Sequence, residues 1–196
     1  MAPRQRHRAP VIDAAVRLFR QQGYAATGLN DLVDASGAPK GSLYHYFPEG
    51  KPSIAAAAVE EAGRRVVQTV ETLVRKSNST SELLREHARL LAGWLEKSGY
   101  RDGCPITTVI LELAPTDRRV TEAARKAYSS RQALIEAKLV EDGFSRAEAS
   151  RLAVLCISAL QGSLIQARVD RSRKPVEATA GELGRLIELA RLSRRA

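Results

Sequence analysis

Apolar residues recur at helical spacing along most of the chain. The first stripe is Val11, Ala14, Ala15, Leu18 and Phe19, whose i, i+3, i+4 spacing marks one face of a helix. Comparable stripes, separated by breaks rich in glycine, proline and serine, continue to the end of the sequence. They predict helices over 9–22, 39–47, 52–76, 80–97, 106–113, 118–141, 146–170 and 175–192, and a short helix through Leu29 and Val33 that Gly37 ends. The predicted fold class is therefore all-α, with about nine helices.

Two of these helices are short and lie close together between Thr27 and Phe47. Their apolar positions are Leu29, Leu32 and Val33 in the first helix, and Leu43 and Phe47 in the second. Gly37 ends the first helix, because glycine accepts the left-handed backbone that a helix end often needs. Pro39 suits the first position of the next helix. Two short helices joined by a tight turn predict a helix-turn-helix, whose second helix can enter the DNA major groove.

The second short helix has a polar face without acidic residues. That face is predicted to carry Lys40, Gly41, Ser42, Tyr44, His45 and Tyr46, while Leu43 and Phe47 point inward. A surface that offers hydrogen-bond donors and lacks Asp and Glu fits a polyanion. The alternative is a helical hairpin of any all-α protein, with a solvated polar face.

The chain has 196 residues, a net charge of +9 and a pI near 10, which favours anionic partners. Residues 1–52 hold seven Lys/Arg and four Asp/Glu, a net charge of +3, so net charge alone does not place a DNA-binding face. Cys104 and Cys156 are too few for a disulfide scaffold and suit a reducing cytoplasm. The uncharged run from Leu152 to Ala167 falls short of the roughly 20 apolar residues that span a bilayer. We expect a soluble, cytoplasmic protein with no membrane partner.

The motif from Gly23 to Lys51 resembles the DNA-binding segment of the tetracycline-repressor (TetR) family of bacterial regulators. The matching residues are Gly-Tyr-x-Ala-Thr, then Gly-Ala-Pro-Lys-Gly-Ser-Leu-Tyr-His-Tyr-Phe, then Gly-Lys. Two positions depart from the family pattern. Gly28 stands where Thr or Ser is usual, and Pro39 stands where Ser is frequent, so two hydroxyls near the DNA are missing.

The resemblance implies a double-stranded DNA operator as partner and a set of DNA-binding residues. Carried over to this sequence, and with the basic N-terminal arm added, the set is Arg4, Arg6, Thr27, Lys40, Gly41, Ser42, Tyr44, His45 and Lys51. The arm either contacts phosphates or a minor groove, or is a solubilising tail. Lys51 is matched to a phosphate contact, and an ordinary surface lysine is the alternative.

The resemblance also implies two domains and a homodimer. Residues 1–52 would form the helix-turn-helix domain, and residues 53–196 the helical ligand-binding and dimerisation domain. The last two helices commonly form a four-helix contact between subunits in this family. The corresponding interface residues are Leu155, Ala159, Gly162, Leu183, Leu186 and Ile187. Binding to two DNA half-sites requires two DNA-binding domains, which favours a dimer. The alternative is that the same helices complete the core of the monomer.

The second domain would hold a small-molecule effector. Gly103-Cys104-Pro105, with Gln161-Gly162 later, resembles the LmrA/YxaF-type subgroup, which responds to drug-like or aromatic compounds. Candidate lining residues are Leu91, Trp94, Tyr100, Cys104, Ile110 and Leu113. Each could instead be ordinary core, and an oxidant-sensing role for Cys104 has little support.

No enzyme constellation appears in the sequence. There is no Glu-x-x-His pair, no Walker sequence and no Gly-x-Ser-x-Gly elbow. No zinc-type spacing is present either, so no cofactor and no metal are expected. The interpretation is a non-enzymatic transcriptional repressor, released from its operator by a small hydrophobic or aromatic ligand. The alternative is a DNA-binding protein with no small-molecule effector.

Overall fold

The computed structural model describes residues 6–193, and every regular element in that range is a helix. The helices are α1 (Arg8–Gln22), α2 (Leu29–Ser36), α3 (Lys40–Tyr46), α4 (Lys51–Lys76), α5 (Thr80–Lys97), α6 (Pro105–Leu113), α7 (Arg118–Glu141), α8 (Arg146–Asp170) and α9 (Lys174–Leu192). Their bounds agree with the predicted helices to within one residue at nearly every end, and the all-α prediction is confirmed.

The chain divides into two compact units that interleave in sequence. Unit 1 takes the described part of Met1–Arg65 together with Cys104–Tyr128, and unit 2 takes Val66–Gly103 and the described part of Ser129–Ala196. The long helices α4 and α7 therefore each contribute residues to both units. The sequence predicted two contiguous domains, residues 1–52 for DNA binding and residues 53–196 for ligand binding and dimerisation. That functional division stays a prediction.

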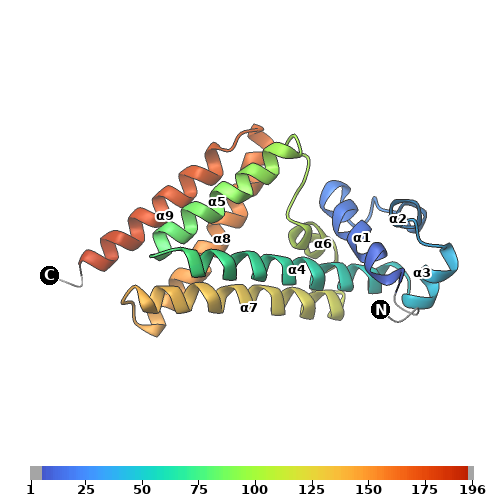
Figure 1. Cartoon of the computed structure of the whole chain (residues 1–196), viewed down its shortest axis with the longest axis horizontal. Helices are drawn as coiled ribbons and strands as arrows, with labels where there is room; N and C mark the ends of the chain where they lie inside the picture. The colour runs from blue at the N-terminus through green and yellow to red at the C-terminus, as the bar shows by residue number, and fades with distance from the viewer. Residues whose placement is uncertain (1–5, 194–196) are drawn as a thin grey trace. The chain divides into compact units, whose positions relative to one another are not determined.

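Unit 1 is built around one apolar core. In it α1 packs against α2, α3 and α6 (Figure 1). The core includes the fully buried side chains of Phe19, Leu32, Leu43, Ile54 and Val109. Because both short helices bury their apolar positions here, the positions of α2 and α3 within unit 1 follow from the stripes in the sequence.

The helix ends of unit 1 explain how the turn is made. Gly37 has φ 64° and donates its N–H to the carbonyl of Val33 at 3.0 Å, which closes α2. At the start of α2, where a capping hydroxyl is absent, the Asp31 carboxylate accepts the N–H of Gly28 at 2.7 Å. Pro39 lies one position before α3 rather than inside it.

Unit 2 packs α5, α8 and α9 against one another. The backbones of α5 and α9 come close at Gly184, where an added Cβ would lie 2.7 Å from the Ser81 hydroxyl oxygen. His87 of α5 and Arg131 of α7 are buried in this unit. Burial lowers the pKa of His87 to about 4, and the charge of Arg131 lowers it as well.

The helix α8 has one exposed and one buried apolar face in the single chain. It leaves Leu155, Ile165 and Val169 exposed while it buries Cys156 and Leu160. By length and composition, α8 also meets the requirement for crossing a membrane, although the uncharged run within it was expected to be too short. A single helix of this kind is weak evidence, because core helices of soluble proteins meet the same requirement.

Candidate nucleic-acid interface

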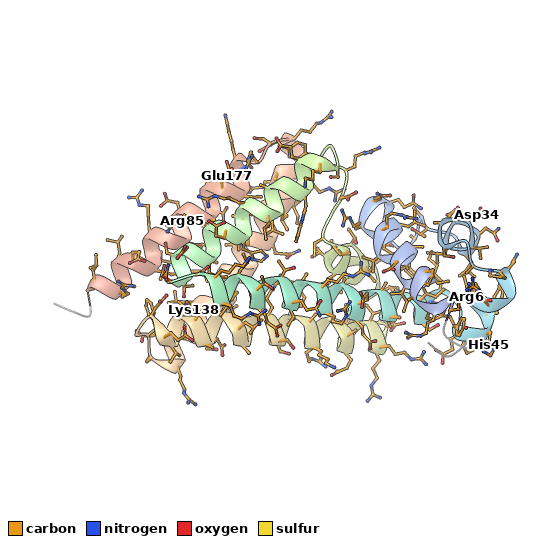
Figure 2. All side chains as sticks on the ribbon, viewed as in Figure 1. Arg6, Asp34, His45, Arg85, Lys138 and Glu177 are labelled. Atoms are coloured by element: carbon orange, nitrogen blue, oxygen red, sulfur yellow. The ribbon has the colours of Figure 1, made fainter. Side chains whose placement is uncertain are left out.

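The α3 helix is attached to unit 1 by its apolar face. Leu43 and Phe47 are buried, whereas Tyr44 is 47% exposed and His45 is exposed as well. Figure 2 shows the labelled His45 at α3, with Asp34 on α2. Lys40 and Gly41 are also exposed, and Ser42 is half-buried. Tyr46 was expected to point outward, but it is half-buried and packs against the core of unit 1.

The charges around α3 favour an anion. The first acidic residue after the helix is Glu49, and its carboxylate is ion-paired with Arg119. Before the helix, Asp31 is occupied with the N–H of Gly28, and the other acid of α2 is the exposed Asp34. The exposed face of α3 therefore carries one cation and several hydrogen-bond donors with no acid on the helix itself.

Basic residues at the start of α1 lie next to α3. The guanidinium carbon of Arg8 is 5.6 Å from the centroid of the Phe47 ring, which follows α3 directly. Arg6 is exposed just before α1, and Figure 2 labels its side chain. Arg4 lies outside the described residues. The two predicted roles of the arm, contact with DNA or a solubilising tail, stay open.

Thr27 does not present its side chain at the surface. It is fully buried, and its hydroxyl donates to the carbonyl of Gly23 at 2.8 Å and accepts from the Gln22 amide at 3.3 Å. Its N–H donates to the carbonyl of Tyr24 at 3.1 Å. Thr27 was expected to contact DNA. Instead it closes the loop between α1 and α2, because its hydroxyl and its N–H both have partners inside that loop.

Lys51 occupies the first position of α4 and is held against the same loop. Its Nζ donates to the carbonyl of Ala25 at 3.2 Å and lies 4.2 Å from the centroid of the Tyr24 ring. Partial burial lowers the pKa of Lys51, while Glu112 and Asp31 act in the opposite direction. Burial, with the nearby charges of Asp117 and Glu112, raises the pKa of the Tyr24 hydroxyl. An ammonium has three donors, so the bond to Ala25 leaves Lys51 able to contact a phosphate.

Glu112 of α6 is a functional candidate that sequence reasoning missed. Its carboxylate accepts the N–H of Tyr24 and the N–H of Ala25, each at 2.7 Å. The two oxygens thereby satisfy two adjacent backbone donors in the loop that precedes α2. Glycine is favoured at position 23 by its φ of 85°, and an added Cβ there would lie 2.8 Å from Glu112 Oε1, so the carboxylate would have to shift. No local motif predicts a contact between residues 88 positions apart.

Two family models match the chain and cover most of it. The model for bacterial regulatory proteins of the tetR family matches residues 11–63, and the model for the C-terminal domain of LmrA/YxaF-like transcriptional regulators matches residues 80–182. The HTH-type transcriptional regulator YxaF of Bacillus subtilis is 32% identical over 187 residues, which cover 95% of this chain and 98% of YxaF. The chain belongs to the TetR family of transcriptional regulators.

Other relatives and solved structures agree with this assignment. The HTH-type transcriptional regulator LmrA of Bacillus subtilis is 28% identical, over 86% of this chain and 90% of LmrA. A crystal structure of a TetR regulator from Chloroflexus aurantiacus matches with a TM-score of 0.79 at 25% identity, over 96% of this chain and 97% of that one. The regulatory protein TetR from Rhodobacter sphaeroides matches in fold, with a TM-score of 0.81 at 19% identity over 91% and 97% of the two chains. The family consists of DNA-binding regulators and not of enzymes, as predicted.

The six effector candidates of this TetR-family chain fall into different units. Cys104, Ile110 and Leu113 belong to unit 1, where they are half-buried and pack against its core. Leu91, Trp94 and Tyr100 belong to unit 2. Trp94 is 45% exposed, so it is not the packed core residue that was one alternative.

The predicted dimer residues of the TetR-family chain divide by burial. Leu183 and Ile187 are buried inside unit 2, so they complete the core of the monomer. Leu155, Leu186 and Gly162 are exposed, and Ala159 is half-buried. The exposed apolar face of α8 and α9, as we call it below, consists of Val154, Leu155, Ile165, Val169, Leu186, Leu189 and Leu192.

Proposed function

We propose that this regulator is a repressor that binds its operator as a homodimer, in the cytoplasm, and is released by a small hydrophobic or aromatic ligand. The observation that carries the DNA-binding part is the α3 helix, whose apolar residues are buried while its acid-free polar face is exposed. In this arrangement α3 of each subunit enters the major groove of one half-site.

The DNA-binding residues divide into two roles. Lys40 and Ser42, near the start of α3, reach base edges and so choose the sequence. Tyr44 and Lys51 contact phosphates and hold the protein in position, which adds affinity at every sequence. Gly41 lets the backbone come close to the duplex, His45 adds a donor, and Arg6 extends the contact along the backbone.

The dimer is supported by the exposed apolar face of α8 and α9. Val169 is 78% exposed and Leu189 is 62% exposed in the single chain. Apolar side chains gathered on neighbouring helices mark an interaction surface. A second copy of the same face would bury them in an isologous contact and provide the second reading head.

Repression is supported by the name of one relative, and the C-terminal domain is where a releasing ligand would bind. The match to the LmrA/YxaF-like C-terminal domain covers α5 to α8 and part of α9. A relative that is 23% identical over 177 residues is named the transcriptional repressor DhaR, from Mycobacterium sp. (strain GP1). Glu112 offers a physical link for release. A ligand that moves α6 would also move the loop whose N–H groups the Glu112 carboxylate holds.

The DNA-binding part is tested by a gel-retardation assay on fragments from beside the chromosomal gene. Affinity should fall steeply as salt rises, because several phosphates are neutralised. Lys40→Ala or Ser42→Ala should reduce the preference for the operator over other DNA, whereas Tyr44→Phe or Lys51→Ala should weaken all DNA similarly. Variants at Lys40 and Tyr44 that bind all DNA as the parent does would refute the proposed reading face.

The effector part is tested separately, by titrating hydrophobic and aromatic compounds while following the fluorescence of Trp94. A compound that changes this fluorescence should also release the operator fragment. If no compound releases the DNA, the protein is a DNA-binding protein without an effector, and the DNA-binding proposal is unaffected.

A further inference from the structure

A cleft in unit 2 is lined by four cationic side chains and no carboxylate. The cleft has a volume of about 520 Å³, and its lining residues are Lys97, Ser98, Gly99, Tyr100, Arg101, Arg168 and Arg171. They come from the C-terminal ends of α5 and α8 and from the loop that follows α5. A volume of this size suits a small organic ligand, since such sites typically measure about 300–1,000 Å³.

The charges of the cleft are not neutralised by ion pairs. In the described chain, none of the four cations lies within ion-pairing distance of a carboxylate. The recorded hydrogen bonds go to neutral groups instead. Arg168 Nη2 donates to the carbonyl of Arg101 at 3.0 Å, and Arg101 Nε donates to the carbonyl of Ser98 at 3.2 Å. Each guanidinium has five donors, so these bonds fix the side chains and leave donors for an anion.

Nearby acids do not face into the cleft. Glu96 is ion-paired with Arg173 at 3.7 Å, Asp102 is buried, and neither lines the cleft. Asp170 precedes Arg171 in the chain, is exposed, and is also absent from the lining. The cleft is therefore surrounded by positive charge on the sides that its ligand would touch.

Backbone strain gathers at the same cleft. Among the described residues, the non-glycine positions with positive φ are Tyr100 at 61° and Arg171 at 46°, and both line it. A left-handed backbone is unfavourable for residues with a Cβ and tends to occur at binding sites. The C-terminal ends of helices attract cations, which accounts for Lys97 and Arg168 at the ends of α5 and α8. It does not account for Arg101 in the loop, whereas the left-handed backbone of Arg171 is the C-cap of α8, with its N–H donated to the carbonyl of Ala167.

We propose that this cleft binds a small molecule carrying phosphate groups, with Lys97, Arg101, Arg168 and Arg171 as the recognising cations. Arginine recognises phosphate through paired donors, and lysine adds a mobile point charge. The half-buried Tyr100 supplies an aromatic wall for the organic part of the ligand. Tyr100 is also one of the six effector candidates, but the proposal rests on the cations and does not depend on release by a hydrophobic ligand.

The test measures pyrophosphate binding to the full-length protein by calorimetry at constant ionic strength. We expect saturable binding of one pyrophosphate per chain. Lys97→Gln and Arg168→Gln should each weaken it about three- to tenfold. Lys97 makes no recorded side-chain hydrogen bond, so its variant should leave the fold unchanged. Arg151→Gln is the matched control, because it removes an exposed arginine from α8 outside the cleft.

A second measurement places the ligand. In an amide NMR spectrum, pyrophosphate should shift the signals of Gly99 and Arg171 before those of α1 to α3. Absence of binding, or equal weakening by the Arg151 control, would overturn the proposal. A third outcome would also overturn it: pyrophosphate does not bind, and Lys97→Gln and Arg168→Gln weaken non-specific binding to duplex DNA. The cations would then contact DNA.

Discussion

The two units of the chain differ in how many of their large apolar side chains are exposed. In the described part of unit 1, those that are exposed are Tyr44 and Leu111. Unit 2 exposes Leu90, Trp94, Val140, Val154, Leu155, Ile165, Val169, Leu186, Leu189 and Leu192. Unit 1 therefore buries nearly all of its large apolar side chains, whereas unit 2 leaves many of them exposed in the single chain.

The contrast is clearest between α3 and α8. In α3 the buried residues and the exposed residues are chemically distinct, so the polar face is available for DNA. In α8 both faces are apolar, and the monomer buries one of them. A helix that is apolar all round is expected to be covered on all sides. The uncovered face of α8 is therefore the strongest physical argument for the proposed dimer.

The largest expected effect comes from placing a charge on the exposed apolar face. Ile165→Arg should leave the monomer folded, because this side chain is 55% exposed in the single chain. In a dimer the same arginine would be buried and unpaired, which is strongly unfavourable. We expect a monomer in analytical ultracentrifugation. Operator affinity should fall about a thousandfold, because the avidity of two linked reading heads is lost.

The control for this variant is Val140→Arg, which places the same charge at an exposed apolar position on α7, outside α8 and α9. It should leave both the oligomeric state and the operator affinity unchanged. A dimer that survives Ile165→Arg would show that unit 2 pairs through another surface, or that it does not pair at all.

The second prediction compares the stability of variants at two neighbouring residues of α3. Leu43 is fully buried, so Leu43→Ala should reduce the free energy of unfolding by about 3–4 kcal/mol through lost burial and a cavity. Tyr44→Phe removes an exposed hydroxyl and should change stability by less than about 0.5 kcal/mol. Urea unfolding followed by circular dichroism measures both. Equal destabilisation by the two variants would mean that α3 does not have the inward and outward faces described above.

The two units should also respond to different pH ranges. Burial keeps the pKa of His87 in unit 2 at about 4, below its ordinary 6.5. The unfolded chain therefore binds the proton more readily, so stability present above pH 6.5 is lost as the pH falls to 4. The expected loss is up to about 3 kcal/mol. Urea unfolding followed by Trp94 fluorescence, which reports on unit 2, measures it, and His87→Gln should flatten the pH dependence in this range.

Unit 1 supplies the comparison for that pH experiment. Hydrogen bonds from Arg64 and Arg65 hold the pKa of Glu61 at about 2, against an ordinary 4.5. Its contribution is therefore present above pH 4.5 and is lost only as the pH falls towards 2. Because the ion pairs of Glu61 involve exposed arginines, we expect less than about 1 kcal/mol from them. A loss of stability between pH 6.5 and 4 that persists in His87→Gln would assign the effect to another group.

The helices could be predicted from the sequence because the patterns that define them are local. Gly37 and the Asp117 cap of α7, whose carboxylate accepts the N–H groups of Arg119 and Val120, act within a few residues of the helix ends that they define. The inward positions Leu43 and Phe47 followed from spacing alone. Such features depend on neighbouring residues, and periodicity reports them directly.

Several candidate site residues are buried in the single chain, which periodicity did not indicate. Thr27 and Leu183 have residue types that fit a DNA contact and an interface, but each is buried by its own unit. Tyr46 is likewise half-buried beside exposed neighbours on a helix of only seven residues. Whether a side chain is exposed depends on which elements pack together, and a single sequence does not contain that information in any local pattern.

The role of Glu112 could not be predicted from the sequence. Its variant is expected to have a small effect on stability and operator affinity. Glu112→Gln keeps the size of the side chain but removes the charge that accepts the N–H groups of Tyr24 and Ala25. Bonds to a charged acceptor are stronger than neutral ones, but this pair is exposed, so we expect a loss of about 1 kcal/mol or less. Operator affinity, measured by gel retardation, should fall a few-fold because the loop before α2 is held less firmly. Glu122→Gln, which alters an exposed acid on α7 paired only with a helical neighbour in the described chain, should leave operator affinity unchanged. If both variants bind the operator as the parent does, α6 does not help to position the reading helix, and the proposed route from ligand to DNA must run elsewhere.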